Sequence, residues 1–226
     1  MVSIETYKDS YKADWNNFVD SSKNSTFLFN RDFMDYHSDR FEDFSLMVYE
    51  KSELIALLPL NIIKNKVYSH QGLTYGGLIV KNNIKFPKFL ELFTQILKYL
   101  NKKSVDKIFI KQIPLIYNSN FNGELDYLSF VIGGNIYRRD IISVIDMQNS
   151  FKISKDRIQG YKRGLKNNLE IREVDCFDEF WNYILIPTLS KRHSVKPVHN
   201  LDEINQLGSN FNNNIKKYND CLLYTS

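Results

Sequence analysis

The sequence predicts an α/β protein in which a mixed sheet is flanked by helices. Short apolar runs with period-two alternation are interleaved with segments whose apolar residues recur at helical spacing. Up to residue 148 the predicted order is β-α-α-β-β-β-α-β-α-β, and interleaved strands and helices are typical of layered α/β folds. Aromatic residues are plentiful, with 16 Phe, 14 Tyr and 2 Trp, so the chain has ample material for a core.

The chain opens with a strand over 2–7, which alternates, and a helix over 10–22. Four apolar residues of this helix recur at the spacing of one face, namely Tyr11, Trp15, Phe18 and Val19. Asn30 is placed to cap a second helix that runs to Ser38, because its side chain can accept a bond from the first turn.

Two strands follow over 44–50 and 54–63, and a short polar turn at 51–53 joins them. Pro59 interrupts the second strand. Because proline cannot donate to a strand ladder, it predicts an edge position or a bulge there.

The segment Tyr68–Val80 is rich in glycine and leads into a strand over 78–80. Glycine permits positive φ and lets another backbone or a ligand come close. Loops held between strands are also where binding residues concentrate. Both a plain turn and a binding loop fit this segment, whose glycines are Gly72, Gly76 and Gly77.

The next elements begin with a helix that carries Pro87 in its first turn, where proline is tolerated. In order, they are a helix over 86–103, a strand over 106–111, a helix over 124–131 that ends at Gly133, and a strand over 136–147.

From residue 149 the pattern starts again. A strand at Ile171 precedes a helix with Trp181, as the strand at Ile4 precedes a helix with Trp15. This weak repeat predicts a first lobe over 1–148 and a truncated second lobe over 149–220. The elements expected in the second lobe are a basic helix over 154–169, a strand over 170–174, helices over 177–189 and 202–207, and a strand starting at 214–218.

The last six residues, Cys221–Ser226, correspond to one reading frame of the transposon end used in a common sequencing library. We interpret 221–226 as an adaptor scar, which is left out of fold reasoning. The natural chain is then expected to continue beyond this point.

Composition excludes several classes of protein. The net charge of +4 is too small to indicate nucleic-acid binding by itself, and DNA is not an expected partner. Only Cys176 and Cys221 are present, which excludes a disulfide framework and a cysteine zinc site. No apolar run is long enough to span a membrane, and the N-terminus does not resemble a signal peptide. A cytoplasmic location is therefore expected.

Four stretches carry a family likeness: Thr26–His37, Ser69–Leu78, Tyr161–Lys166 (Tyr-Lys-Arg-Gly-Leu-Lys) and Phe180–His199, which includes Trp181-Asn-Tyr-Ile-Leu-Ile-Pro. In these residues the chain resembles the FemABX-like branch of the GNAT superfamily, bacterial proteins with two tandem GNAT-type lobes. The resemblance implies a GNAT-like mixed sheet flanked by helices, followed by an incomplete second GNAT-like lobe.

The resemblance also implies an activity, the transfer of an acyl group to an amine of an amino sugar or peptide precursor in the cell envelope or a surface polysaccharide. The implied donor is acyl-CoA, or aminoacyl-tRNA in a peptidoglycan bridge transferase. The acceptor is a small molecule or a nucleotide- or lipid-linked precursor, which would allow peripheral membrane contact. A non-catalytic lobe that only binds the precursor is the alternative outside enzymes.

One motif departs from the family pattern. GNAT lobes that use acyl-CoA carry Gln/Arg-x-x-Gly-x-Gly/Ala at a strand-to-helix turn, where backbone N–H groups hold pyrophosphate. This chain has Lys81-Asn82-Asn83 at that junction. The departure leaves open whether the donor binds to this lobe or to the missing part of the second.

Two residues of the glycine-rich segment are candidates for substrate binding. His70 is the only residue put forward as a catalytic base, since histidine titrates near neutral pH; the alternative is a structural loop histidine. Tyr75 can position a hydroxyl of the substrate or pack with its own hydroxyl satisfied. The catalytic residue is otherwise not assigned.

In the second lobe the candidates are Lys162 and Arg163 on the basic helix, whose face can hold a diphosphate or an RNA backbone or be merely solvated. Its other face, Ile158, Tyr161 and Leu165, is expected to point to a core.

His193 and His199 could line an acceptor cleft between lobes. Their spacing lacks the i, i+4 geometry of a zinc pair, so no metal site is expected.

Overall fold

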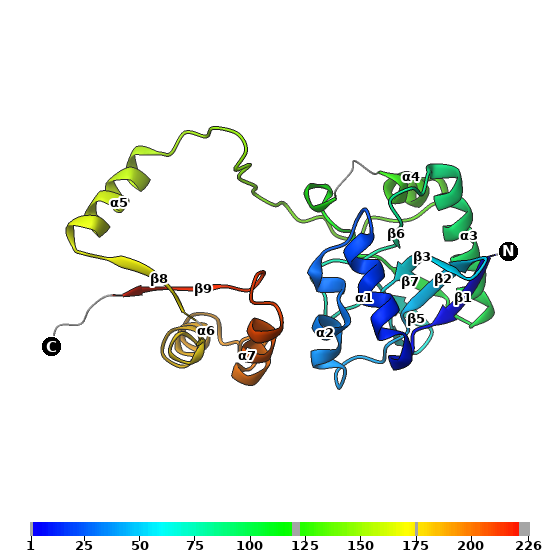
Figure 1. The fold of residues 1–226 in the computed structure, drawn as a ribbon, viewed down its shortest axis with the longest axis horizontal. Helices are drawn as coiled ribbons and strands as arrows, with labels where there is room; N and C mark the ends of the chain where they lie inside the picture. The colour runs from blue at the N-terminus through cyan, green and yellow to red at the C-terminus, as the bar shows by residue number, and fades with distance from the viewer. Residues whose placement is uncertain (1, 119–122, 175, 222–226) are drawn as a thin grey trace. The chain divides into compact units, whose positions relative to one another are not determined.

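The computed structural model describes residues 2–118, 123–174 and 176–221, so all of the predicted scar at 221–226 except Cys221 lies outside the described residues. The chain forms two compact units, residues 1–135 and 136–226 (Figure 1). Sheets and helices alternate along the chain, and the predicted mixed α/β class is confirmed. The predicted incomplete second lobe over 149–220 stays a prediction.

The first unit contains an antiparallel sheet in the order β1-β2-β3-β6. A two-residue turn joins β2 to β3, and both of its residues, Lys51 and Ser52, have positive φ (48° and 68°). Such left-handed turns match the twist of a hairpin. The strands are β1 (Val2–Thr6), β2 (Leu46–Glu50), β3 (Glu53–Leu58) and β6 (Ile79–Val80).

A second sheet has the order β4-β5-β7, made of β4 (Asn61–Ile63), β5 (Lys66–Tyr68) and β7 (Lys107–Phe109). The strand predicted over 54–63 is thus two strands in two sheets, and the break falls at Pro59, as the missing N–H requires. β5 was not predicted as a strand. It pairs antiparallel to β4 across a two-residue turn and parallel to β7, and with three residues it is too short for its periodicity to reveal it.

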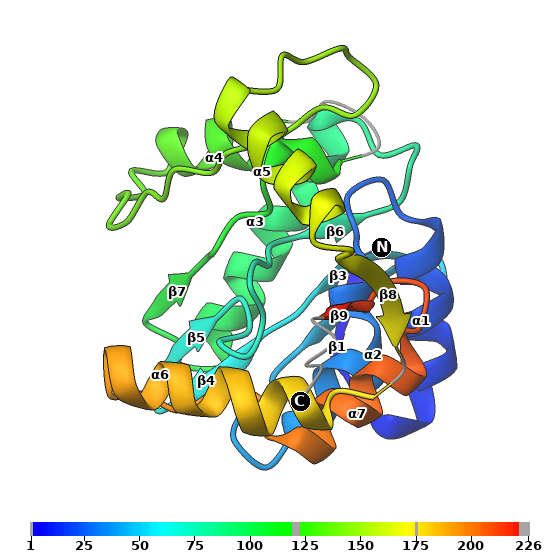
Figure 2. The same ribbon diagram turned by 90° about the vertical axis from the view of Figure 1, so that its left-hand side faces the viewer.

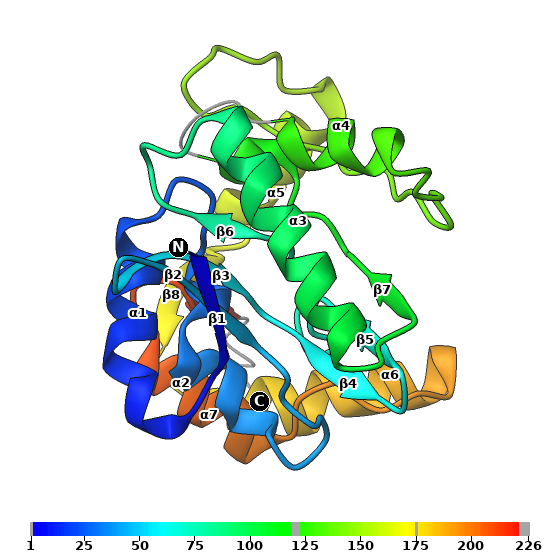
Figure 3. The same ribbon diagram turned by 90° about the vertical axis from the view of Figure 1, so that its right-hand side faces the viewer.

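Helices cover both faces of the antiparallel sheet. α1 (Lys12–Ser21) and α2 (Arg31–Met34) lie on one side and α3 (Phe86–Lys102) on the other (Figures 1 and 3). Asn30 caps α2 as predicted, because its side chain accepts a bond from the Asp32 N–H. α4 (Glu124–Val131) follows the second sheet.

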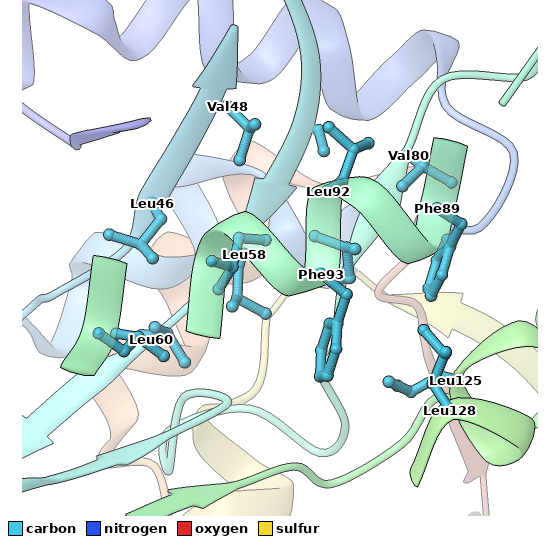
Figure 4. Close-up of a cluster of buried hydrophobic side chains, with 14 of the residues drawn as sticks. Leu46, Val48, Leu58, Leu60, Val80, Phe89, Leu92, Phe93, Leu125 and Leu128 are labelled. Atoms are coloured by element: carbon cyan, nitrogen blue, oxygen red, sulfur yellow. The ribbon is translucent and has the colours of Figure 1, made fainter. Parts of the chain in front are cut away.

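The main core lies between α3 and the sheet (Figure 4). Leu46 and Val48 of β2 face it, whereas Met47 between them points to the opposite side, as the period of a strand requires. From the helices come fully buried or nearly buried residues, among them Phe89, Leu92, Phe93, Ile96, Leu100 and Leu128.

The second unit contains α5 (Lys155–Lys166), α6 (Ile186–His193), α7 (Leu201–Asn210) and a two-stranded antiparallel sheet of β8 (Glu170–Val174) and β9 (Lys217–Cys221). A π-helical turn, Phe180–Leu185, leads into α6 (Figure 2). The unit has a small core of Phe177, Trp181 and Ile204.

Two predictions for the second unit were wrong. Residues 136–147 form no strand, and Ile141 in this stretch is 97% exposed. A strand needs a neighbour for its N–H and C=O groups, and no strand in the described part of the chain pairs with it. The stripe of α5 predicted to face a core is also exposed, at Ile158 (40%), Tyr161 (68%) and Leu165 (55%).

Candidate functional site

The glycine-rich segment leaves the second sheet and then rejoins it. The Ser69 N–H still bonds to the Phe109 carbonyl, at 2.8 Å, and Gly76 returns to the ladder in a parallel bridge with Gln112. Residues 70–75 therefore form an excursion between β5 and β6. A side chain at Gly76 would overlap the Ser69 carbonyl oxygen, so glycine is required where the excursion closes.

Beyond Gly76 and Gln112 the two parallel segments separate. β6 pairs with β3, whereas the chain after Gln112 turns away through Pro114. A cavity of about 20 Å³, room for about one water molecule, lies between them. Its lining includes Gly77, Leu78, Gln112 and Ile113 from the two segments, and Phe89 and Leu125 from α3 and α4.

A polar segment, Ser22–Ser25, covers an edge of β6 beside this cavity. The Asn24 side-chain amide donates to the Leu78 carbonyl at 2.8 Å, and its oxygen accepts from the Val80 N–H at 2.9 Å. The Lys23 N–H donates to the Val80 carbonyl at 3.1 Å. The side chain of Asn24 thus supplies the donor and acceptor that a neighbouring strand would present.

His70 lies at the start of the excursion with a positive φ of 62° and is 4% exposed. Its ring lies 5.6 Å from that of His37 and 5.5 Å from that of Phe41, centroid to centroid. Burial lowers the pKa of His70 to about 4, against the opposing pull of Asp43. The ring is therefore neutral at pH 7. In this conformation it packs against the rings of His37 and Phe41, and its role as a base stays a prediction.

Two contacts fix the excursion around His70. Asn61 clamps Gln71, since its side-chain oxygen accepts from the Gln71 N–H at 2.7 Å and its amide donates to the Gln71 side chain at 3.0 Å. Gly72 packs directly on the His37 ring, where a Cβ would overlap Nε2. The position of the loop is thus set by close backbone packing.

Arg31 forms a buried charged centre that the sequence analysis did not select. Its guanidinium lies 3.4 Å from the Tyr7 ring centroid and 4.1 Å from that of Trp15, and its Nη1 bonds to Asp35 and Asp43. Burial raises the pKa of Tyr7 to about 12 and also raises the pKa of Asp35. One sequence signal exists: a cation in the first turn of a helix, where the dipole disfavours it.

Tyr75 is buried, and in this structure its side chain packs with its hydroxyl bonded, which was one of its two predicted roles. The hydroxyl bonds to Thr26 Oγ1 at 2.9 Å, and the ring meets Phe29 edge-on and lies 5.4 Å from the Tyr117 ring. Burial raises the pKa of Tyr75, so the phenol stays protonated at neutral pH. Both Tyr75 and His70 belong to the excursion, and the structure brings them into the same unit.

The other four candidates lie in the unit 136–226. Lys162 and Arg163 are exposed on α5, and His193 is exposed in the last turn of α6. His199 is half-buried, and its carbonyl accepts a bond from Trp181 Nε1 at 3.2 Å. The predicted acceptor cleft stays a prediction.

The described residues contain no candidate metal site and no candidate membrane span. No cluster of three or more His, Cys, Asp or Glu side chains suited to a metal ion occurs there. Among the helices of the described ranges, none has the length and apolarity needed to cross a membrane.

Comparison with known proteins adds structural similarities only. No protein-family model matches the chain, and no curated protein does either. Among solved structures, the chain is similar to the ribosomal-protein-S18-alanine N-acetyltransferase from Escherichia coli, with a TM-score of 0.36 and 10% identity over 48% of this chain and 64% of that one.

Two more solved structures show similarity of the same order. The PaiA N-acetyltransferase from Thermoplasma acidophilum, in complex with coenzyme A, has a TM-score of 0.33 and 15% identity over 46% of this chain and 75% of that one. A transcriptional regulator from Bacillus halodurans has a TM-score of 0.36 and 9% identity over 64% of this chain and all of its own. Similarity at this level leaves the function to be argued from the site itself.

Proposed function

We propose that the unit of residues 1–135 binds the acyl donor of an N-acyltransferase. In this proposal a FemABX-type protein transfers an acyl group to an amine of an amino sugar or peptide precursor, in bacterial envelope or surface-polysaccharide biosynthesis. The observation that carries the proposal is the separation of the two parallel segments beyond Gly76 and Gln112, with a cavity at the point of separation.

The chemistry suits such a place. Acyl transfer from a thioester to an amine needs orientation of the two reactants and donors for the tetrahedral oxyanion, and it needs no protein nucleophile. The stretch Gly77–Leu78 offers backbone groups beside the cavity, and Gly77 presents no side chain there. An acyl arm placed between the segments would have its carbonyl next to these groups.

A diphosphate of the donor would lie at the start of α3. Lys81-Asn82-Asn83 departs from the family pattern, and Pro87 in the first turn of α3 has no N–H, but the dipole of the helix still attracts an anion to its N-terminus. Lys85, the residue that precedes α3, is exposed and adds a positive charge beside that turn. These two features support acyl-CoA as the donor.

The test is binding and turnover by the full chain. Calorimetry with coenzyme A is compared between wild type, Ile113→Trp, which fills the cavity, and Ile116→Trp, whose site is 53% exposed and outside the cavity lining. Binding is expected for wild type and Ile116→Trp and not for Ile113→Trp. Because overpacking costs about 1–3 kcal/mol, thermal unfolding must show that Ile113→Trp is folded. Equal binding by both variants contradicts the proposed position.

One observation favours the aminoacyl-tRNA alternative. α5 carries five basic side chains and one acidic one over 12 residues, with Lys162 and Arg163 exposed. A face of this charge can hold an RNA backbone through charge-assisted bonds that weaken with salt. Consumption of charged tRNA in place of acyl-CoA would favour this donor. Tight precursor binding without turnover of either donor would favour the non-catalytic module.

A further inference from the structure

The segment Ser22–Ser25, which we call the strap, occupies the edge of β6. Its bonds to β6 follow strand geometry: Ser22 bridges Lys81 in antiparallel sense, and the Lys23 N–H bonds to the Val80 carbonyl. The Asn24 side chain then takes the place of a peptide group, accepting from Val80 and donating to Leu78. The edge is therefore satisfied by the chain itself.

The strap also keeps the cavity small. Asn24 is part of the lining, and the remaining space of about 20 Å³ holds about one water molecule. An acyl arm with amide groups would need the same carbonyl and N–H of β6, because extended chains bind a strand edge through main-chain bonds. The ligand and the strap would therefore compete for the same backbone groups of β6, the Leu78 carbonyl and the Val80 N–H.

The composition of the strap suits release. Its sequence, Ser-Lys-Asn-Ser, has no apolar side chain, although Lys23 and Asn24 are only 6% and 7% exposed. Lifting it would break polar contacts without exposing a hydrophobic residue of its own. Its main anchor is the ion pair of Lys23 Nζ with Glu124 Oε1 at 2.8 Å, at the first residue of α4.

We infer that the strap is an occluding segment, which the amide-bearing arm of the acyl donor displaces from the β6 edge. The inference rests on the proposed function and adds a regulatory step to it. Because only the open state binds, the apparent affinity is the intrinsic affinity reduced by the fraction of open molecules. Weakening the strap should therefore tighten donor binding.

The experiment compares Asn24→Ala with wild type by calorimetry, using coenzyme A and free pantetheine as probes. Asn24→Ala removes two bonds to β6 and is expected to bind both probes about tenfold more tightly. Asn101→Ala, at an exposed position near the end of α3, is the matched control and should bind as wild type does.

Hydrogen exchange on wild type provides a readout that a merely structural role would not move. With coenzyme A bound, the Lys23 N–H is expected to exchange faster, because the strap is released, while the Val80 N–H becomes more protected. Protection of both amides, or equal affinity of wild type and Asn24→Ala, overturns the inference that the strap occludes the β6 edge. The proposal that this unit binds the acyl donor is unaffected by either result. Failure of wild type and Asn24→Ala to bind either probe overturns both.

Discussion

Helices α3 and α5 have similar sequence patterns and opposite surroundings. Each has an apolar stripe at helical spacing. In α3 the stripe is buried, with Leu92 and Ile96 both 0% exposed, whereas in α5 Tyr161 is 68% exposed and Leu165 55%. The pattern of each sequence correctly predicted a helix. Burial depends on a second surface, which β2 and β3 supply to α3 and which the described part of the second unit does not supply to α5.

The difference in burial predicts that truncation costs more free energy of unfolding in α3 than in α5. A comparison of Leu92→Ala with Leu165→Ala tests this. Leu92→Ala leaves a cavity in the main core and should lower the free energy of unfolding by about 4 kcal/mol. Leu165→Ala should change it by less than about 0.5 kcal/mol, since its site is largely exposed. Urea unfolding measures both. A large loss for Leu165→Ala would mean that α5 packs on a surface in solution.

The same contrast shows how far sequence reasoning extended. Local signals predicted the elements whose causes are local: Asn30 caps α2 and the 51–53 turn forms a hairpin. Pro59 predicted an edge or a bulge, and the predicted strand divides there. Elements whose causes are distant were missed. The apolar run over 136–147 resembles a strand but has no partner in the described ranges, and the three-residue β5 lies between its neighbour β4 and the distant β7.

The candidate site followed the same rule. The glycine-rich segment was recognised because its three glycines lie close together in the sequence. The bond of Asn24 to β6 was missed because it joins residues that are 54 positions apart. Arg31 was missed because its partners Tyr7, Trp15 and Asp43 are scattered along the chain. His70 was selected for its chemistry, and only the fold shows that it is buried.

Burial of His70, in contrast to the exposed His193, predicts an acid sensitivity in the first unit. The folded pKa of about 4 lies below the ordinary value of 6.5, so the unfolded chain binds the extra proton first. The contribution of neutral His70 to the free energy of unfolding is complete above about pH 6.5. It is lost as the pH falls to about 4, by up to about 3 kcal/mol. His70→Asn should flatten this loss, and asparagine tolerates the positive φ at this position.

The control is His193→Asn, the same substitution at an exposed site of the second unit. Urea unfolding at pH 7, 5.5 and 4 gives the pH dependence of the free energy of unfolding for wild type and for each of the two variants. Parallel curves for His70→Asn and wild type would show that His70 titrates normally and is solvated.

The smallest expected effect concerns two glycines of the second unit. At Gly160 in α5 an added Cβ would meet no atom within 4 Å, whereas at Gly208 in α7 it would lie 2.7 Å from the Phe177 ring. Gly160→Ala should therefore stabilise α5 by about 0.5–1 kcal/mol through helix propensity alone, and Gly208→Ala should destabilise α7. Hydrogen exchange of the amides in each helix measures the two effects separately. A loss of protection in Gly160→Ala would indicate that another element approaches this face of α5 in solution.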